Sequence, residues 1–288
     1  MMMGKMKEAL LKKSAGFRRA MFYVKAEIRD VRDLYLTTAK RRQLTPWGFV
    51  LVGGSSQHHR AMQTGAFEPE ETSLFMECLK QTDVFVDVGA NIGYYSAIAR
   101  HSGKRVICLE PLAANLEFLY ATCAENKWDD LEVFPMGAGK KPGIARLYGA
   151  SGTGASLLQH WAGSSGIFQR VIPLTTIDIL LSERLGPARV FIKIDVEGAE
   201  YDVLQGAQKT LQMVPKPRWL VEITLNEFHP QGIHPHYMQV FEVFWKLGYV
   251  ARTANAAGTI INRADVEKWV RQGHSESGVI NYIFSPAA

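Results

Sequence analysis

The sequence predicts an α/β fold organised around a doubly wound, mostly parallel sheet. Short apolar runs rich in β-branched and aromatic residues alternate with stretches whose apolar residues recur at helical spacing. Parallel strands joined by helices produce this alternation, and strands covered on both faces read as continuous apolar runs. The composition of the 288-residue chain, 47% hydrophobic and 21% charged, is that of a globular protein and excludes the disordered and collagen-like classes.

The elements can be assigned in order along the chain. Five runs are expected to form buried strands: Val84–Val88, Arg105–Leu109, Leu131–Pro135, Val190–Ile194 and Trp219–Ile223. The helical patterns beside them are Glu70–Lys80, Ile92–Ser102, Ala113–Asn126, Ala199–Met213 and Phe241–Leu247. Extended segments are also expected at Trp47–Val52, Tyr249–Thr253 and Val279–Phe284. The last two could pair as an edge hairpin.

A long interval separates the third and fourth of these strands. It contains two β-like runs, Ile144–Tyr148 and Gln169–Leu174, on either side of a glycine- and serine-rich stretch, and then a helical pattern at Ile177–Leu185. Long insertions in compact domains are usually functional loops. We therefore interpret residues 139–175 as an inserted hairpin on the substrate side.

Positive charge is concentrated at the start of the chain. Residues 1–42 hold 12 Lys and Arg against 4 Asp and Glu, a net charge of +8. The remaining residues hold 21 against 24, so the body carries −3 and the whole chain +5. A basic core that binds nucleic acid is therefore disfavoured.

Apolar residues in this segment recur every seven positions. They form two offset series, Leu10, Phe17, Val24 and Val31, and Met21, Ile28 and Tyr35. The pattern predicts a basic helical extension over residues 1–45, followed by one domain over residues 46–288. Three interpretations stay open: a helix packed on its own domain, a helix that pairs with a second subunit in a homodimer, and an interfacial helix whose basic face meets anionic lipid or an acidic carrier.

The cysteines and the length of the apolar runs indicate in which cellular compartment the protein is expected. Cys78, Cys108 and Cys123 lack C-x-x-C spacing, which argues against a disulfide framework and a structural zinc site. No apolar run approaches the ~20 residues of a membrane span, and the first residues lack the apolar core of a signal peptide. We therefore expect a cytoplasmic protein without a transmembrane segment.

The first chemical motif is Asp87-Val88-Gly89-Ala90-Asn91-Ile92-Gly93. It follows a predicted strand and opens a predicted helix, where glycines let the backbone turn tightly and come close to a ligand. Asn91 stands where a dinucleotide-binding loop carries its second glycine, so a nicotinamide-dependent dehydrogenase is disfavoured. Asp87 puts a carboxylate at the strand end, which suits a ligand with an ammonium and a sulfonium better than a pyrophosphate.

Acidic residues also follow other strands. Glu110 ends the second strand 23 residues after Asp87, where a carboxylate can accept hydrogen bonds from both hydroxyls of a ribose. Asp195 follows the fourth strand, in which Lys193 is an expected ion-pair partner, and Glu222 ends the fifth. Ligands of open α/β sheets bind beyond the carboxyl ends of the strands, so these acids are expected at the mouth of a cleft. Glu197 and Glu200, just after Asp195, could equally be acids that the helix dipole favours.

The chain resembles the FkbM family of S-adenosylmethionine-dependent methyltransferases over about residues 65 to 228. The resemblance is carried by Phe67-Glu68-Pro69-Glu70-Glu71-Thr72, by the Asp87–Gly93 motif with Tyr94-Tyr95, by Glu110-Pro111, and by Lys193-Ile194-Asp195-Val196-Glu197-Gly198-Ala199-Glu200. It implies a class I, Rossmann-like sheet of seven strands whose last strand is antiparallel and inserted. It also implies methyl transfer, most often to a hydroxyl oxygen of a sugar, a glycan or another natural product. Because some relatives methylate nitrogen, N-methylation of a peptide side chain or amine is the alternative.

The resemblance also implies where the cofactor S-adenosylmethionine (SAM) would bind. The glycine loop would meet its methionine end, Glu110 its ribose, and Met136–Ala138 would flank its adenine. The residues expected to bind the cofactor are Asp87, Gly89, Ala90, Asn91, Gly93, Tyr94, Glu110, Pro111, Gly137, Ala138 and Asp195.

An acceptor hydroxyl loses its proton during transfer, so a general base would assist. His229, Asp195 and Glu222 are the candidates: histidine has a suitable ordinary pKa, whereas a carboxylate would need a raised pKa or could orient a histidine. The residues expected to bind the acceptor are His58, His59, Ser156, Lys193 and Glu197. We expect no metal, although two carboxylates at adjacent strand ends could hold a divalent cation that binds a sugar diol. A non-catalytic binding module is a rival that the intact loop and the acidic strand ends disfavour.

Overall fold

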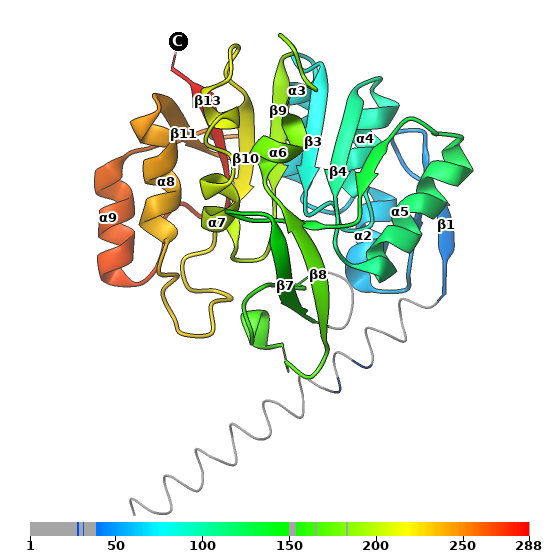
Figure 1. Cartoon of the computed structure of the whole chain (residues 1–288), viewed down its shortest axis with the longest axis horizontal. Coiled ribbons are helices and arrows are strands. Elements are labelled where there is room, and N and C mark those ends of the chain that lie inside the picture. The colour runs from blue at the N-terminus through cyan, green and yellow to red at the C-terminus, as the bar shows by residue number, and fades with distance from the viewer. Residues whose placement is uncertain are drawn as a thin grey trace, which may run out of the picture.

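The computed structural model describes residues 39–149, 154–164, 166–182 and 184–287, together with Ile28 and Val31. Apart from these two residues, the seven-residue series predicted in the basic extension lie outside the described part of the chain. Helices lie on both faces of one central sheet (Figure 1).

The central sheet contains eight strands in the order β12-β11-β13-β10-β9-β3-β4-β5. Five neighbouring strands are parallel, and each lies within one residue of its predicted run. Their bounds are β3 Val84–Val88, β4 Arg105–Leu109, β5 Glu132–Phe134, β9 Val190–Ile194 and β10 Arg218–Glu222. These runs were predictable because strands buried on both faces need apolar residues at every position.

The C-terminal strands complete the sheet. β13 (Asn281–Pro286) lies between β10 and β11 (Tyr249–Thr253) and is antiparallel to both, while β12 (Ile260–Ile261) adds a short edge strand beyond the seven expected. The order confirms the class I methyltransferase fold with an inserted antiparallel last strand. β11 and β13 pair with each other, as the expected edge hairpin requires, but β13 lies inside the sheet and not at its edge. Tyr282, Ile283 and Phe284 are all buried, so β13 needs cover on both faces.

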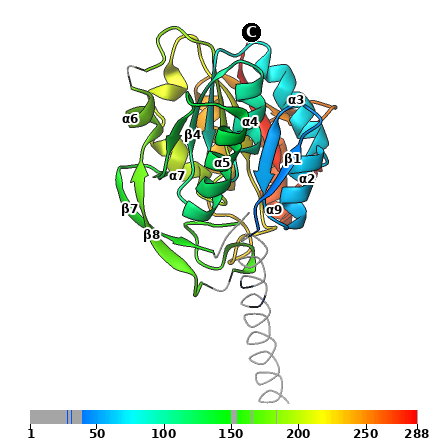
Figure 2. The ribbon, with the colours of Figure 1, turned by 90° about the vertical axis from the view of Figure 1, so that its right-hand side faces the viewer.

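Alternate residues of the strands build two separate cores. Val84, Val86 and Val88 pack with helices α6 to α9, whereas Phe85 packs with α2 to α5 and with β2 (Val50–Gly53). Figure 2 shows α6 and α7 on one side of the sheet and α2 and α3 on the other. This follows from the two-residue period of a strand, which sends neighbouring side chains to opposite faces. The helix bounds are α2 Gln57–Thr64, α3 Pro69–Leu79, α4 Tyr94–His101, α5 Ala113–Asn126, α6 Ile177–Leu181, α7 Glu200–Gln205, α8 Tyr237–Lys246 and α9 Arg263–Gln272.

Two helices, α2 and α9, were not expected from the apolar pattern. α9 buries only Val266 and Trp269, so its periodicity is weak. Its start is instead specified by a capping box, in which the Asn262 side chain accepts from the Asp265 N–H and the Asp265 side chain accepts from the Asn262 N–H. At the start of α2, the Ser56 side chain accepts from the backbone N–H of His59. The capping residues Ser56 and Asn262 were therefore the sequence signal from which these two helices could have been predicted.

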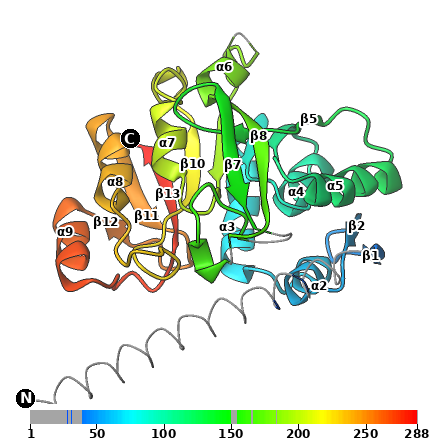
Figure 3. The same ribbon diagram turned by 60° about the horizontal axis from the view of Figure 1, so that its bottom comes forward.

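The insertion between β5 and β9 forms the predicted hairpin. β7 (Gly143–Tyr148) and β8 (Gln169–Thr175) are antiparallel, and β6 (Gly137–Ala138) adds a short parallel strand that was not predicted. The hairpin crosses in front of the sheet (Figure 3), where Leu147 packs with Leu112 of the β4–α5 connection. The 139–175 insertion therefore covers the carboxyl ends of the parallel strands.

Residues 41–53 form a second hairpin. β1 (Arg41–Leu44) pairs with β2 (Val50–Gly53), so the helical extension expected over residues 1–45 is wrong for Arg41–Leu44. β2 is held against α5, because Thr122 and Asn126 accept hydrogen bonds from the N–H groups of Val52 and Val50 at 3.0 and 2.9 Å. Side chains of α5 thus accept hydrogen bonds from N–H groups of β2 that would otherwise be unpaired.

No helix in the described part of the chain is long and apolar enough to cross a membrane.

Replacing Asn262 by Ala removes one half of the capping box of α9. We expect the free energy of unfolding to fall by about 1 kcal/mol, measured by chemical denaturation. Glu267→Ala, on the exposed face of the same helix, is the matched control and should change it by less than ~0.5 kcal/mol. Equal effects of the two substitutions would contradict the capping role.

Candidate active site

A cavity of about 370 Å³ opens at the carboxyl ends of β3, β4, β9 and β10. The strand order reverses between β3 and β9, which is the switch point where open α/β sheets bind ligands. The inserted hairpin contributes Leu147 and Ile172 to the wall, and α2 contributes His58 and Met62. The volume lies in the range of small-molecule sites.

The loop from β3 to α4 comes into direct contact with the end of β9. A Cβ atom added to Gly89 would lie 1.9 Å from the carbonyl oxygen of Asp195, and the φ of Gly89 is +92°. A Cβ added to Gly93 would lie 2.9 Å from Leu119 of α5. Only glycine fits these two positions, so the motif serves close packing of the backbone as well as access to a ligand.

Asp87 is buried at the end of β3, beside Lys193 in the register of the two strands. Its carboxylate accepts a hydrogen bond from the Ser96 hydroxyl at 2.7 Å. Burial raises the pKa of Asp87 to about 6, against the opposing effect of Lys193. The loop that follows carries Ala90, Asn91 and Tyr94 into the cavity wall, whereas Gly93 lies outside it.

Glu110 joins the glycine loop to the start of α5. Its two oxygens each accept a backbone N–H, from Asn91 and from Leu112, at 2.8 Å. Burial raises the pKa of Glu110 to about 7. Because each carboxylate oxygen has two lone pairs, Glu110 can still accept from a ligand in the cavity, which it lines beside Pro111.

Lys193 and Asp195 form the ion pair at the centre of the site. The Lys193 Nζ donates to Asp195 Oδ2 at 2.6 Å and lies 4.8 Å from the centre of the Tyr95 ring. Burial alone would lower the pKa of Lys193, but Asp195, Glu68 and Asp87 outweigh it, so the pKa is raised above its ordinary value. Lys193 is therefore a buried cation that balances the carboxylates around it, rather than an exposed ligand.

Glu68 was missed as a site residue. It lies in the cavity wall, accepts a hydrogen bond from the Tyr95 hydroxyl at 2.6 Å, and has a left-handed backbone conformation with φ of 41°. Burial raises its pKa, while Lys193 lowers it. Such strained backbone often occurs at functional sites. The signal was in the sequence, because Glu68 belongs to the Phe67–Thr72 motif.

Glu197 connects the sheet to the segment 154–164. Its carboxylate accepts from the Trp161 indole N–H at 2.6 Å, and its carbonyl accepts from the Ser156 hydroxyl at 2.5 Å. Burial and, secondly, Asp195 raise the pKa of Glu197 to about 8. Ser156 itself is buried outside the cavity wall, whereas its neighbours Ala155 and Leu157 line it. Ser156 thus fixes the segment, and Glu197 lines the cavity.

Glu222 ends β10 and lines the cavity. Within the described residues its carboxyl forms no hydrogen bond or ion pair, although it lines the cavity with Asp195. Burial, followed by the charges of Asp195 and Glu197, raises the pKa of Glu222 well above its ordinary range. Glu200, by contrast, is buried outside the cavity wall and accepts a hydrogen bond from the Gly198 N–H at 2.9 Å. This contact agrees with the alternative that Glu200 is an acid at the start of its helix.

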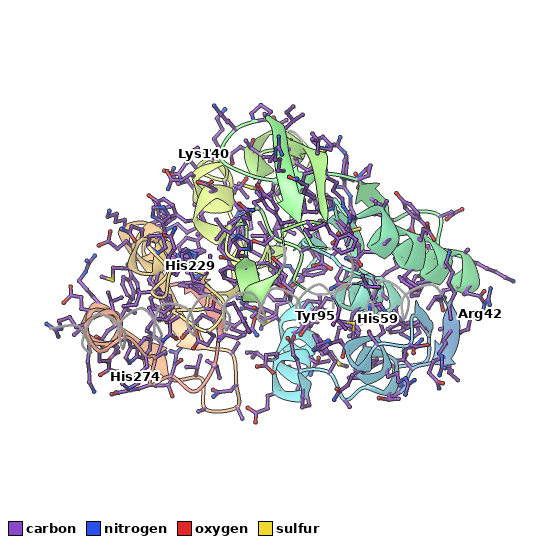
Figure 4. The ribbon with its side chains drawn as sticks, turned by 90° about the horizontal axis from the view of Figure 1, so that it is seen from below. Arg42, His59, Tyr95, Lys140, His229 and His274 are labelled. Carbon is purple, nitrogen blue, oxygen red and sulfur yellow. The ribbon has the colours of Figure 1, made fainter. Side chains whose placement is uncertain are left out.

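The histidines fall into different places. His58 is exposed and lines the cavity, whereas the Nδ1 of buried His59 accepts from the Gly54 N–H at 2.8 Å. Burial lowers the pKa of His59 to about 4, and His59 lies outside the cavity wall in which it was expected. His229, on the loop after β10, packs against the ring of Trp161. It lies outside the cavity wall, and Figure 4 shows it away from Tyr95 and His59. Burial also lowers its pKa.

Met136, Gly137 and Ala138, which the resemblance places beside the adenine, line the same cavity as Pro111. A Cβ on Gly137 would lie 2.8 Å from the Leu174 side chain, so the hairpin packs directly on this strand. Among the residues that the structure describes, no group of three His, Cys, Asp or Glu side chains is arranged to hold a metal ion.

A family model described as the methyltransferase FkbM domain matches residues 87–251, more than half of the chain. The chain belongs to the FkbM methyltransferase family. The matched region begins at Asp87 and takes in the glycine loop, Glu110, the Lys193–Asp195 pair and Glu222. This FkbM protein is thus a SAM-dependent methyltransferase, with the cavity at the place where the family motifs meet.

Solved structures similar to the chain include other methyltransferases. A precorrin-6y methyltransferase from Geobacter metallireducens is 14% identical, with a TM-score of 0.40, over 75% of this chain and 86% of its own. An O-methyltransferase from Bacillus cereus in complex with SAH is 11% identical, with a TM-score of 0.41, over 74% and 78%. These scores are too low to assign an acceptor. A comparison with curated proteins found no match.

The raised pKa values of buried carboxyls make the stability of the ligand-free protein depend on pH. The pKa values of Asp87, Glu110 and Glu200 are raised to about 6, 7 and 7. A carboxyl whose pKa is higher in the folded than in the unfolded state stabilises the fold at low pH and loses that contribution as pH rises through the folded value. The free energy of unfolding should therefore fall between about pH 5 and pH 8.

Glu200→Gln removes one of these titrations and keeps an acceptor for the Gly198 N–H. Chemical denaturation of this variant should show a flatter pH dependence over the same interval. Asp129→Asn, an exposed carboxyl exchanged in the same way, is the control and should leave the slope unchanged. A slope that is the same in all three proteins would refute the assignment to Glu200.

Proposed function

We propose that the enzyme methylates a hydroxyl oxygen of a sugar, a glycan or another natural product, using Asp195 and Glu222 to bind and deprotonate the acceptor. The observation that carries the proposal is the division of the cavity. Its β3–β4 side has a glycine loop and Glu110, whereas its β9–β10 side has two carboxylates at adjacent strand ends.

The β3–β4 side fits SAM. The carboxylates of Asp87 and Glu68 suit a ligand that carries an ammonium and a sulfonium, and the bare backbone at Gly89 permits close approach. Glu110 would accept from the ribose hydroxyls, and Met136, Gly137 and Ala138 would flank the adenine. When bound, SAM supplies a methyl group on a positively charged sulfur, so the chain itself has only to position the acceptor and remove its proton.

On the β9–β10 side, Asp195 is oriented by its bond to Lys193 and would accept a hydrogen bond from the acceptor hydroxyl. Glu222 is the better proton acceptor. Its raised pKa makes the carboxylate more basic, and a base of this kind contributes roughly 10²- to 10⁴-fold. Holding the acceptor oxygen in line would contribute still more, up to about 7–11 kcal/mol in favourable cases. His229 is disfavoured as the base because it lies outside the cavity wall.

N-methylation of a peptide side chain or amine is the second candidate. The observation in its favour is the excess of carboxylates over Lys193 in the cavity wall, because carboxylates would also bind a protonated amine. Acid hydrolysis of the labelled product distinguishes the two, because it leaves both kinds of methyl group in place. The label would be recovered on an O-methylated sugar or alcohol in the first case and on an N-methylated amino acid or amine in the second.

Glu222→Gln should reduce turnover by about 10²-fold or more, because the amide cannot take the proton. Asp195→Asn should reduce turnover as well, and both variants should bind SAM in calorimetry with near-normal affinity. Glu267→Gln, on the exposed face of α9, is the control and should keep full activity. Full activity of both site variants would remove the two carboxylates from the mechanism.

Glu110→Gln should weaken SAM binding about tenfold or more, since a hydrogen bond to a charged acceptor is replaced by one to a neutral amide. The pKa of Glu110 is about 7, so the affinity of the wild-type protein should rise as pH increases through that value, and the variant should lose this dependence. Calorimetric titrations at several pH values measure both effects. Unchanged affinity in the variant would rule out the ribose contact.

A further inference from the structure

One carboxyl in the wall of the active-site cavity has no part in the proposed methyl transfer. Among the wall residues that the structure describes, six carry carboxyls: Glu68, Asp87, Glu110, Asp195, Glu197 and Glu222. The proposed function uses the first three for SAM, and Asp195 and Glu222 for the acceptor hydroxyl. Glu197, which follows β9, is left without a ligand.

The carboxyl of Glu197 is held in one direction by the segment 154–164. Its Oε2 accepts from the Trp161 indole N–H at 2.6 Å, and the backbone of Gly154 provides a further hydrogen bond. The Trp161 ring is itself buried against Gly198, where an added Cβ would lie 2.5 Å from it. Because a carboxylate has about four lone-pair sites, Glu197 can still accept from a ligand in the cavity.

The backbone conformation of Glu197 also indicates a functional position. Its φ is 56°, in the left-handed region, which costs a residue other than glycine about 1–3 kcal/mol. Among the described residues, six other than glycine have a positive φ, and four of these line the cavity: Glu68, Asn91, Ala162 and Glu197. Backbone strain is thus concentrated around the cavity, as it is in sites that hold a ligand in place.

The charge on the β9–β10 side of the cavity is unbalanced. Lys193 is the only Lys or Arg among the described wall residues, and its ammonium is already bonded to Asp195 at 2.6 Å. Burial and, secondly, Asp195 raise the pKa of Glu197 to about 8. A buried carboxylate costs several kcal/mol unless it is paired. Once Glu222 has taken the proton of the acceptor hydroxyl, Asp195 and Glu197 would face Lys193 alone, so one further cation would balance the charge.

We propose that Glu197 determines acceptor specificity by binding a protonated amine of the acceptor, next to the hydroxyl that is methylated. The inference rests on the proposed O-methylation and narrows the acceptor to an amino sugar or another amino alcohol. A neutral acceptor would leave the carboxylate of Glu197 without a counter-charge, and an acceptor with a phosphate or carboxylate here would be repelled by three carboxyls. Trp161 is a positioning residue, because its indole N–H sets the direction of the carboxyl.

The test uses protein labelled with ¹⁵N at its six tryptophans and saturated with S-adenosylhomocysteine, so that no methyl group is transferred. The NMR signal of the Trp161 indole N–H, assigned by its loss in Trp161→Phe, reports on the carboxyl that accepts from it. The probes are glucosamine, galactosamine and mannosamine, each compared with the sugar that has a hydroxyl in place of the amine. At least one amine should shift the signal with an affinity about tenfold or more above that of its neutral counterpart, because only the amine forms a bond between two charged groups.

Glu197→Gln removes the charge and keeps an oxygen that can accept from the Trp161 N–H. The preference for the amine should disappear in this variant, while calorimetry should give a near-normal affinity for S-adenosylhomocysteine. Glu267→Gln, which makes the same exchange on the exposed face of α9, is the matched control and should keep the preference.

Equal affinity of the wild-type protein for each amine and its neutral counterpart, including no binding of either, would overturn the inference and leave the proposed O-methylation standing. A preference that survives in Glu197→Gln would overturn it as well. The methylated atom is read separately, from acid hydrolysis of the labelled product. Recovery of the label on nitrogen would contradict the proposed O-methylation, whatever binding preference is measured.

Discussion

The buried ion pair between Lys193 and Asp195 is the interaction on which the site depends. Removing an ammonium group from water costs several kcal/mol unless it is paired and hydrogen-bonded. Lys193 is 3% exposed, and it meets that requirement with Asp195 at 2.6 Å, with the nearby charges of Asp87 and Glu68, and with the face of Tyr95. Each of these partners comes from a different part of the fold, so the sheet and two helices must assemble before the cation is satisfied.

The same pair explains why the proposed cofactor side and the proposed acceptor side of the cavity adjoin. β9 lies between β3 and β10, and Lys193 is in register with Asp87 on one side and Leu220 on the other. The glycine loop can then pack on the carbonyl of Asp195, where any side chain at Gly89 would collide with it. One strand end thus joins the loop that would hold SAM to the carboxylates that would hold the acceptor.

How far the sequence predicts the structure depends on what each residue packs against. The parallel strands were predictable because each is buried on both faces, and the acids at their ends follow from topology. α2, α9 and β1 were missed, because their caps and edge hydrogen bonds leave little apolar periodicity. His59, Ser156 and His229 were expected in the site from residue type alone, yet all three lie outside the cavity wall. The Nδ1 of His59 and the hydroxyl of Ser156 instead form hydrogen bonds with the backbone. Glu68 shows the opposite case, since its role depends on contacts with Tyr95 and Lys193 that join distant parts of the chain.

The most direct measurement of this account is the titration of Lys193 itself. NMR of protein labelled with ¹³C at the lysine side chains follows each ammonium group, and the loss of one signal in Lys193→Arg assigns it. Lys193 is expected to remain fully protonated at about pH 10.4, where half of the lysine side chains in a model peptide have lost their proton. Deprotonation of Lys193 at or below that pH would contradict it, because the surrounding carboxyls would then not carry the charge that the site requires.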